Sequence, residues 1–276
     1  MTKININIYH ISYDLEIKLA NALLIKGNYK KLNTRQIDKL KRYIIKKNLR
    51  LQIEDILSIR SSYMTMKIMK NSNRLKNSIN KIYKLYGKNR SLKELSKKYD
   101  LPPIPLIKNI LYKKKYSKDM VKSFFYGENL NKLNDFDSKQ LIFAIENDIF
   151  NKVVQTSQIE NSENFEIEVG NFLKKHNIKF KTQDELVKEQ IQKYGRPINT
   201  PDFLILSDFY INNKKINWID AKNFYGANTY LVKKKIKKQV KKYINKYGDG
   251  SIFFSLNFSE KLNFNNVMLV SYNSIK

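Results

Sequence analysis

The sequence contains no cysteine, and its 276 residues include only two histidines, His10 and His176. The lack of cysteine excludes disulfide bridges and thiolate metal sites, and the shortage of histidine excludes a histidine-rich zinc site. No apolar run approaches the roughly 20 residues that span a bilayer, and the first residues lack the uninterrupted apolar core of a signal peptide. We therefore expect a soluble, intracellular protein with no membrane partner, in a reducing compartment.

Acidic residues are scarce: the chain has 25 Asp and Glu but 53 Lys and Arg, which gives a net charge of +28. Such an excess attracts polyanions, and contacts between lysine and phosphate supply most non-specific affinity for nucleic acid. The abundance of Lys, Asn, Ile and Tyr, with few arginines, is also the bias that an AT-rich genome gives every protein it encodes. The charge therefore predicts a nucleic-acid partner, with genome bias as the alternative explanation.

Glycine is rare in the first half, where only Gly27, Gly87 and Gly127 occur and strand alternation is missing. Residues 1–154 are therefore predicted to form a helical domain with short links. The helices are expected over residues 13–26, 33–47, 52–69 and 74–85, and a capping box is expected at Asn33 and Gln36.

Residues 91–115, SLKELSKKYDLPPIPLIKNILYKKK, are typical of two short helices joined by a tight turn. Ser91 and Glu94 have the spacing of a capping box at the start of the first helix. This pattern predicts a helix-turn-helix unit, with a plain helical hairpin as the alternative. Because the second helix offers few side chains that read base edges, we expect Lys113 and Lys114 to contact phosphates instead.

The pattern changes from about residue 155, where helix and strand signals begin to alternate. An amphipathic helix, three β-prone runs, a lysine-rich helix and further apolar runs follow one another, which describes a small α/β domain. We therefore expect an α/β protein. Its helical half with the helix-turn-helix unit covers residues 1–154, and its second domain covers residues 155–276.

Two carboxylates and a lysine lie in and around two β-prone runs of the second domain. Asp202 precedes the first run, whereas Asp220 and Lys222 close the second. Side chains two apart on a strand share a face, so Asp220 and Lys222 project together while Ala221 leaves its carbonyl accessible. If the strands pair through a turn at residues 212–213, Asp202 comes beside Asp220 in an oxygen site suited to Mg²⁺. A neighbouring lysine orients or deprotonates water, as metal-assisted phosphodiester hydrolysis requires.

A third carboxylate is available on the amphipathic helix upstream, where Glu166 and Glu168 lie. Acid-x-Lys triplets are common in such a lysine-rich chain, so a turn aspartate beside a surface ion pair is the alternative to a metal site. No glycine-rich phosphate loop, nucleophilic serine or cysteine in a sharp turn, or histidine-rich motif competes as an active site.

The lysine-rich helix adds a second feature, because Gln239 and Tyr243 lie four residues apart and so share one helix face. They are surrounded by lysines that suit a phosphate backbone, among them Lys234 and Lys238. The alternative is that Gln239 and Tyr243 only pack the helix against its neighbours.

Taken together, these segments resemble a known group of nucleases. The Pro-Asp and Asp-x-Lys arrangement resembles the PD-(D/E)xK nuclease superfamily, which includes archaeal Holliday-junction resolvases. More narrowly, TPDFLIL, INWIDAKNFYG and QVKKYINKYGDGSIFF are similar to the TPD-motif family, of which the codanin-interacting nuclease is an animal member. The likeness extends to the first half of the chain, since that family also has a helical half with a helix-turn-helix unit.

The resemblance implies a PD-(D/E)xK domain over residues 155–276, with Mg²⁺ or Mn²⁺ as cofactor. It also implies that Lys222 is the catalytic lysine, and that Gln239 with Tyr243 supports substrate and active-site geometry. The implied metal ligands are Asp202, Asp220, the backbone carbonyl of Ala221, and Glu166 with Glu168 as its substitute.

We therefore expect a metal-dependent nuclease that hydrolyses DNA, including branched or flapped structures. One alternative is a catalytically silent nuclease-fold platform for nucleic acid and a codanin-like or histone-chaperone partner. Another is a basic nucleic-acid-binding module in which the Pro-Asp and Asp-Ala-Lys pattern is accidental. The choice between DNA and RNA stays open, with DNA favoured. The family resemblance predicts a nuclear as well as a cytoplasmic location, and a homodimer is an alternative to a monomer.

Overall fold

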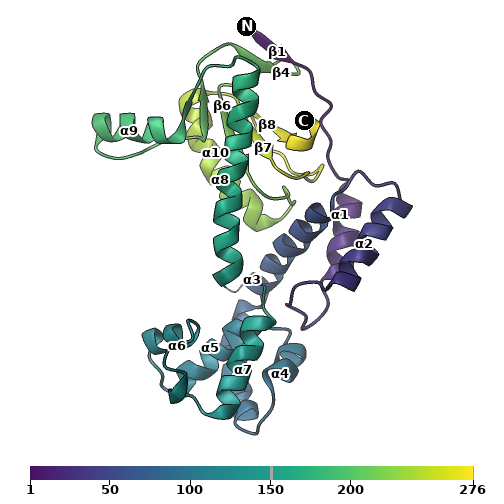
Figure 1. Ribbon diagram of the computed structural model, residues 1–276, viewed down its shortest axis with the longest axis vertical. Helices are drawn as coiled ribbons and strands as arrows, with labels where there is room; N and C mark the ends of the chain where they lie inside the picture. Colours follow the sequence, from purple (N-terminus) through teal and green to yellow (C-terminus); the bar gives the residue numbers. More distant parts are fainter. Residues whose placement is uncertain (150–151, 276) are drawn as a thin grey trace. The chain divides into compact units, whose positions relative to one another are not determined.

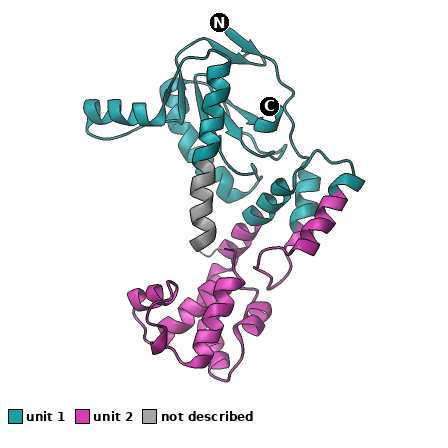
Figure 2. Ribbon diagram, viewed as in Figure 1, with its two compact units in different colours: residues 1–20, 44–62, 158–276 teal, residues 21–43, 63–157 magenta. Residues whose placement is uncertain are grey.

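The computed structural model describes residues 1–149 and 152–275, without the side chains of residues 152–162. The chain divides into two compact units (Figure 2): unit 1 comprises residues 1–20, 44–62 and 158–276, and unit 2 comprises residues 21–43 and 63–157. This division differs from a single boundary at residues 154/155, because two early segments pack into unit 1. Strand β1 (Thr2–Ile4) pairs with β4 (Phe209–Ile211), and the carboxylate of Asp55 accepts a hydrogen bond from the backbone N–H of Asn257 at 2.8 Å.

Unit 1 is built on a five-stranded sheet whose strand order is β2-β3-β6-β7-β8 (Figure 1). The pairs β2–β3 and β3–β6 are antiparallel, and the pairs β6–β7 and β7–β8 are parallel. The strands are β2 (Phe180–Thr182), β3 (Phe203–Ile205), β6 (Trp218–Lys222), β7 (Gly250–Phe254) and β8 (Val267–Ser271).

Two helices cover the two faces of this sheet. Phe165, Val169 and other residues of α8 (Lys152–Lys175) pack with Ile219 of β6 in one apolar cluster. Ile236 and other residues of α10 (Tyr230–Tyr247) pack with Trp218 in a second cluster on the other face. Because alternate residues of a strand face opposite sides, Asp220 and Lys222 share the α10 side of β6 with Trp218.

A second, three-stranded sheet joins β1, β4 and β5 (Lys214–Lys215) in the order β1-β4-β5. The turn at Asn212 and Asn213 connects β4 to β5, and both residues have positive φ, which asparagine tolerates better than most residues. The expected pairing of β3 with β6 is present. The expected connection is wrong, because this turn closes a separate hairpin inserted between those two strands.

Close packing explains two glycines of unit 1. A Cβ at Gly250 would lie only 2.1 Å from the indole of Trp218, so the ring stacks directly on the backbone of β7. A Cβ at Gly226 would lie 2.7 Å from the Cβ of Phe258. Gly226 does not have positive φ, so the need for glycine after β6 comes from this contact.

Unit 2 is helical. Its described elements include α4 (Leu92–Tyr99), α5 (Pro103–Lys113), α6 (Lys118–Phe124), the 3-10 turn η1 (Leu130–Lys132) and α7 (Asp135–Glu146). Four helices contribute residues to both units: α8, α1 (Tyr13–Leu23), α2 (Thr34–Lys46) and α3 (Ile53–Tyr86). A further 3-10 turn, η2 (Tyr272–Ser274), follows β8 in unit 1. None of the helices in the described part of the chain combines the length and apolar character that a bilayer crossing needs.

One helix, α3, replaces the two that were expected over residues 52–69 and 74–85. The intervening residues, Asn71 to Asn73, include no glycine or proline to stop the helix. Moreover, the side chain of Asn71 donates a hydrogen bond to the carbonyl of Asp100 at 3.0 Å, so it does not cap a new helix.

The expected pair of helices around residue 100 is confirmed. Ser91 and Glu94 form the capping box of α4, and Asp100 ends the helix in the left-handed conformation, with φ 53°. The apolar face of α5 is buried against α4, α7 and the end of α3. The ammonium of Lys114 lies 2.5 Å from the buried carboxylate of Asp137, so Lys114 has a partner within the unit, whereas Lys113 is exposed. Contact of this unit with nucleic acid stays a prediction.

Candidate active site

The carboxylate of Asp202 lies beside β6, where the antiparallel ladder between β3 and β6 stops. The last ladder pair joins Phe203 to Ile219. Beyond it, Oδ2 of Asp202 accepts a hydrogen bond from the backbone N–H of Ala221 at 2.6 Å. The side chain thus takes the place of a backbone acceptor, and this bond keeps the carboxyl group of Asp202 beside the strand that carries Asp220.

Asp220 is fully buried on the α10 side of the sheet. Its Oδ1 accepts a hydrogen bond from Nε2 of Gln239 at 2.9 Å. Its Oδ2 lies 2.5 Å from the ammonium of Lys222, two residues further along the same strand. The sequence prediction that Asp220 and Lys222 project together from one strand face is therefore met in the geometry.

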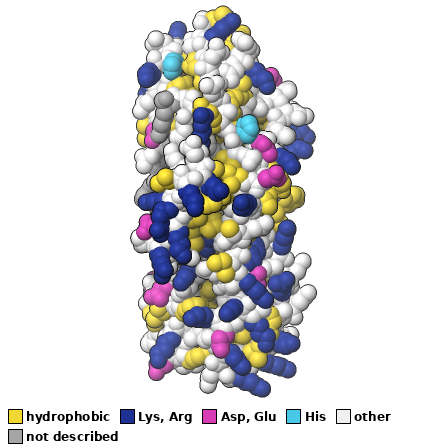
Figure 3. All heavy atoms as spheres, turned by 90° about the vertical axis from the view of Figure 1, so that its right-hand side faces the viewer, with side chains coloured by type: hydrophobic (Ala, Val, Ile, Leu, Met, Phe, Trp, Pro, Cys, Tyr) yellow, Lys and Arg dark blue, Asp and Glu magenta, His cyan; other side chains and the backbone are white. Residues whose placement is uncertain are grey.

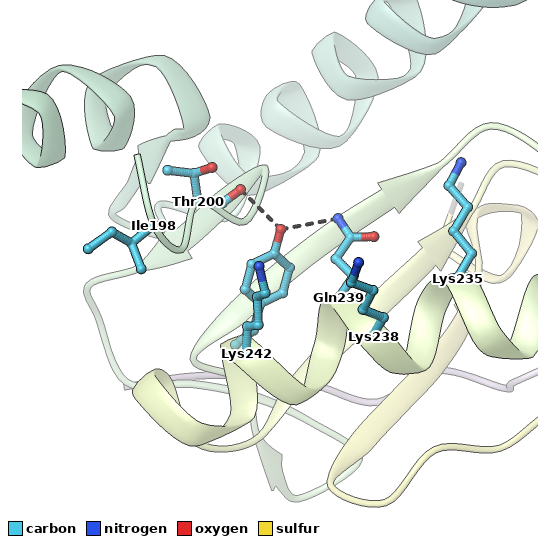
Figure 4. Close-up of a pocket in the computed structure, with 7 residues that line it drawn as sticks. Ile198, Thr200, Lys235, Lys238, Gln239 and Lys242 are labelled. Atoms are coloured by element: carbon cyan, nitrogen blue, oxygen red, sulfur yellow. Dashed lines mark hydrogen bonds between the residues drawn. The ribbon is translucent and has the colours of Figure 1, made fainter. Parts of the chain in front are cut away.

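A chain of hydrogen bonds links Asp220 back to the segment that carries Asp202, and its part from Gln239 to Thr200 is drawn in Figure 4. Nε2 of Gln239 also contacts the hydroxyl of Tyr243 at 3.1 Å, and this hydroxyl donates to the backbone carbonyl of Thr200 at 3.1 Å. Gln239 and Tyr243 lie one turn apart on α10, so a single helix face contacts both Asp220 and the backbone two residues before Asp202.

Burial dominates the electrostatics of the two aspartates. It raises the pKa of Asp202 to about 8, and the nearby charge of Asp220 adds to the effect. Burial also raises the pKa of Asp220, although Lys222 acts in the opposite direction. For Lys222, burial alone lowers the pKa, but the carboxylates of Asp220 and Asp202 outweigh it, so the net pKa is raised. With both aspartates ionised, one ammonium cannot neutralise them, which favours an added proton or cation.

Of the two candidate acids on α8, Glu166 is the one that the charges of this site influence. Burial raises the pKa of Glu166, and the largest charge effects on it come from Lys222, which lowers the pKa, and Asp220, which raises it. Glu168 is exposed, and its backbone carbonyl accepts a hydrogen bond from the hydroxyl of Tyr272 at 3.2 Å. Residues two apart on a helix point about 200° apart, so one face of α8 cannot present both acids to Asp220.

The oxygen atoms gathered here suit a hard divalent cation in their chemistry. In a strand, the N–H and C=O of one residue point to the same side, so the carbonyl of Ala221 lies on the Asp202 side of β6. Together with the three carboxylates it offers oxygen donors of the kind that Mg²⁺ and Mn²⁺ take. Oδ2 of Asp220 is buried without a well-oriented hydrogen-bond donor, although the Lys222 ammonium lies beside it. Among the described residues, no three acidic, histidine or cysteine side chains are already close enough to form a metal site.

A basic pocket adjoins the two aspartates (Figure 4). It has a volume of about 270 Å³, and its lining residues are Ile198, Thr200, Lys235, Lys238, Gln239, Lys242 and Tyr243. Of the two lysines that were predicted on this helix, Lys238 lines the pocket and Lys234 does not. The sequence analysis missed Lys235 and Lys242. Their spacing was the available signal, since residues three and seven positions after Lys235 fall on the same helix face as Lys235.

Basic residues are not confined to this pocket. On the face shown in Figure 3, lysine and arginine side chains clearly outnumber the acidic ones. The pocket is distinguished by its position beside buried carboxylates, because Gln239 both lines it and donates to Asp220.

Comparisons with known proteins place this site inside the part of the chain that a family model matches. A family model described as a protein of unknown function with the TPD sequence motif matches residues 134–273, which contain all the site residues named above. An uncharacterized protein of Acanthamoeba polyphaga mimivirus is 25% identical over 175 residues, which cover 61% of this chain and 60% of that protein. The match therefore spans less than two thirds of that relative. No solved structure matches.

Proposed function

We propose that this chain, which belongs to the family of proteins with the TPD sequence motif, is a divalent-metal-dependent nuclease that hydrolyses phosphodiester bonds of DNA. The observation that carries the proposal is the convergence of Asp202, Asp220 and Lys222 beside a lysine-lined pocket. The buried carboxylates outnumber the one ammonium beside them, which favours the binding of a cation. The adjacent lysines favour the binding of a polyanion.

The metal would be held by Asp202, Asp220, Glu166 and the carbonyl of Ala221. When bound, Mg²⁺ or Mn²⁺ polarises a phosphate and makes bound water a stronger nucleophile. Lys222 stays protonated, because its carboxylate neighbours raise its pKa. It therefore balances charge on the phosphate and orients water through its N–H groups, and the raised pKa argues against its acting as the general base.

The remaining residues hold this arrangement in place. Gln239 fixes the orientation of the Asp220 carboxylate, and Tyr243 ties α10 to the backbone at Thr200, two residues before Asp202. The lysines of the pocket would bind the phosphates that flank the scissile bond.

The order of elements in unit 1 supports the same proposal. A helix, three antiparallel strands, a second helix and a parallel strand follow one another as α8, β2, β3, β6, α10 and β7, apart from α9 (Gln183–Tyr194) and the β4–β5 hairpin. This is the succession of helices and strands predicted from the sequence for the second domain, with Asp202 directly before β3 and with Asp220 and Lys222 on β6.

A catalytically silent platform is the second candidate. It is favoured by the ion pair between Lys222 and Asp220, because the ammonium lies directly beside the oxygen that a metal would need. Such a platform would bind nucleic acid through the lysines and present its surface to a codanin-like or histone-chaperone partner.

Cleavage assays with the full-length protein separate the two candidates. Labelled single-stranded, duplex, flapped and four-way-junction DNA, and single-stranded RNA, are incubated with Mg²⁺ or Mn²⁺. Wild type should cleave at least one substrate, and Asp202→Asn should abolish cleavage. The matched control is Asp208→Asn, which alters an exposed aspartate that pairs with Lys215 at the surface. Binding to every substrate without any metal-dependent cleavage would favour the platform, and full activity of Asp202→Asn would contradict the assigned site.

A further inference from the structure

The segment between α9 and Asp202 is held in a fixed position by side chains from two helices. Oε1 of Gln190, a buried residue of α9, accepts hydrogen bonds from the backbone N–H groups of Ile198 at 2.7 Å and Asn199 at 3.0 Å. Its Nε2 donates to the carbonyl of Asn199 at 2.7 Å. One glutamine amide therefore satisfies three backbone groups of this segment.

Helix α10 holds the same segment from the other side. The hydroxyl of Tyr247 donates to the carbonyl of Asn199 at 2.9 Å, and the hydroxyl of Tyr243 donates to the carbonyl of Thr200. Because their backbone groups are bonded from both α9 and α10, residues 198–200 form a wall of defined position along the pocket.

Large apolar side chains are exposed on this wall and on the end of α9 that precedes it. Tyr194 and Ile198 are each 46% exposed, and Ile191 is 47% exposed. Ile198 lines the pocket directly, across from Lys242 in Figure 4. Tyr194 is near the same end of α10, since the Lys246 ammonium lies 5.8 Å from the centre of its ring.

The opposite wall is cationic. Lys235, Lys238 and Lys242 line the pocket from one face of α10, and all three side chains are exposed. The pocket therefore presents ammonium groups on one side and the aliphatic side chain of Ile198 on the other, and the ring of Tyr194 lies outside the lining, near Lys246 of α10.

We infer that this pocket binds an unpaired nucleic-acid strand, with its phosphates on the α10 lysines and its bases against Ile198 and Tyr194. A single strand exposes both a charged backbone and the apolar faces of its bases, and protein sites for it combine cationic grooves with aromatic platforms. In a duplex the base faces are stacked inside, so the apolar wall would contribute little to binding. The substrate is thus a single strand or the unpaired arm of a branched molecule.

The inference deepens the proposed function. Strand binding stands by itself, whereas the position of the cut rests on the proposed nuclease activity. Gln239 lines the pocket and donates to Asp220. A strand bound along the lysines therefore passes next to the proposed metal ligands. The phosphodiester bond that we expect to be cut is therefore the one that the bound, unpaired strand brings next to these ligands.

Binding without metal tests the inference separately from cleavage. Fluorescence anisotropy in EDTA compares a labelled DNA strand, its RNA counterpart and the corresponding duplex, all of one sequence. Wild type should prefer the unpaired strands. The double substitution Tyr194→Ala with Ile198→Ala should weaken strand binding by about fivefold or more, because each stacked base contributes that much in comparable sites, and should leave duplex binding unchanged.

The cationic wall is tested by Lys238→Ala with Lys242→Ala, which should weaken binding to strand and duplex and flatten its dependence on salt. The matched control is Lys237→Ala with Lys241→Ala, which removes equal charge from exposed positions of the same helix outside the pocket lining. Thermal melting checks that every variant is folded.

Three outcomes are decisive. Equal affinity for strand and duplex, with no effect of the Tyr194 and Ile198 substitutions, overturns the inference even if the protein cleaves DNA. Equal losses in the pocket and control lysine variants overturn it as well. A strand preference that depends on Tyr194 and Ile198, in a protein that cleaves nothing, supports the inference and removes the proposed nuclease activity.

Discussion

Replacing Lys222 by methionine should strongly destabilise unit 1, because the substitution keeps most of the side-chain volume and removes only the ammonium. In the wild type this ammonium lies 2.5 Å from Oδ2 of the fully buried Asp220, with its own side chain 14% exposed. Removing one partner of a buried ion pair costs about 3–5 kcal/mol, because the other charge is left without compensation. For a protein of this size such a loss lowers the melting temperature by roughly 10 °C.

The matched control is Lys215→Met. Lys215 also pairs with an aspartate, Asp208, at 2.9 Å, but both side chains are at least half exposed. Surface pairs of this kind contribute less than about 1 kcal/mol. The only tryptophan of the chain, Trp218, is buried two residues from Asp220, so its fluorescence reports directly on the unfolding of unit 1.

Added Mn²⁺ provides the second half of the experiment. Without Lys222, the carboxylates of Asp202 and Asp220 have no resident cation, so Mn²⁺ should raise the melting temperature of Lys222→Met more than that of wild type. Equal melting temperatures for Lys222→Met and Lys215→Met would refute the reasoning about the buried pair. An identical Mn²⁺ effect on wild type and Lys222→Met would refute the assignment of these carboxylates as metal ligands.

Three further predictions concern single residues. Gln190→Ala should lower the free energy of unfolding by about 2 kcal/mol in urea titrations, since three backbone groups lose their partner, and an unchanged midpoint would contradict the role of the amide. Burial acts to raise the pKa of Asp100, but the hydrogen bond from Lys67 and those from other donors hold this pKa below its usual value. The stability that the ionised carboxylate contributes is therefore complete above the unfolded pKa of about 3.9, and it is lost as the pH falls through the pKa of the folded state. Asp100→Asn should then destabilise less at about pH 2 than at about pH 7, and an equal effect would count against this sign. Gly250→Ala should unfold or severely destabilise unit 1 in a thermal melt, because a Cβ would overlap the indole of Trp218, and wild-type stability would show that the ring can shift.

Local signals made several elements predictable from the sequence. The capping box at Asn33 and Gln36 is formed reciprocally, with N···O distances of 3.0 and 2.9 Å. The box at Ser91 also forms, and the next helix buries its apolar face as its spacing predicts. Such signals depend on residues within one or two turns, so tertiary packing did not override them.

Features that depend on distant residues were missed or misplaced. The pairing of residues 2–4 with residues 209–211 joins segments about two hundred positions apart, and no local pattern in either segment indicates it. For the same reason the turn at residues 212–213 was given to the wrong pair of strands. The pocket lysines at positions 235 and 242 needed both the helical phase and the wall at Ile198, which only the folded chain brings together.

The parallel pairing of β1 with β4 has a consequence for the order of folding. Strand β1 leaves the ribosome long before residues 209–211 have been synthesised, and until then its backbone groups have no partner in the sheet. Contacts of such large sequence separation close slowly, because the entropy of a long loop is lost before the contact forms. Translation speed and chaperone binding to the early segment should therefore influence the yield of native protein more than the stability of unit 1 would suggest.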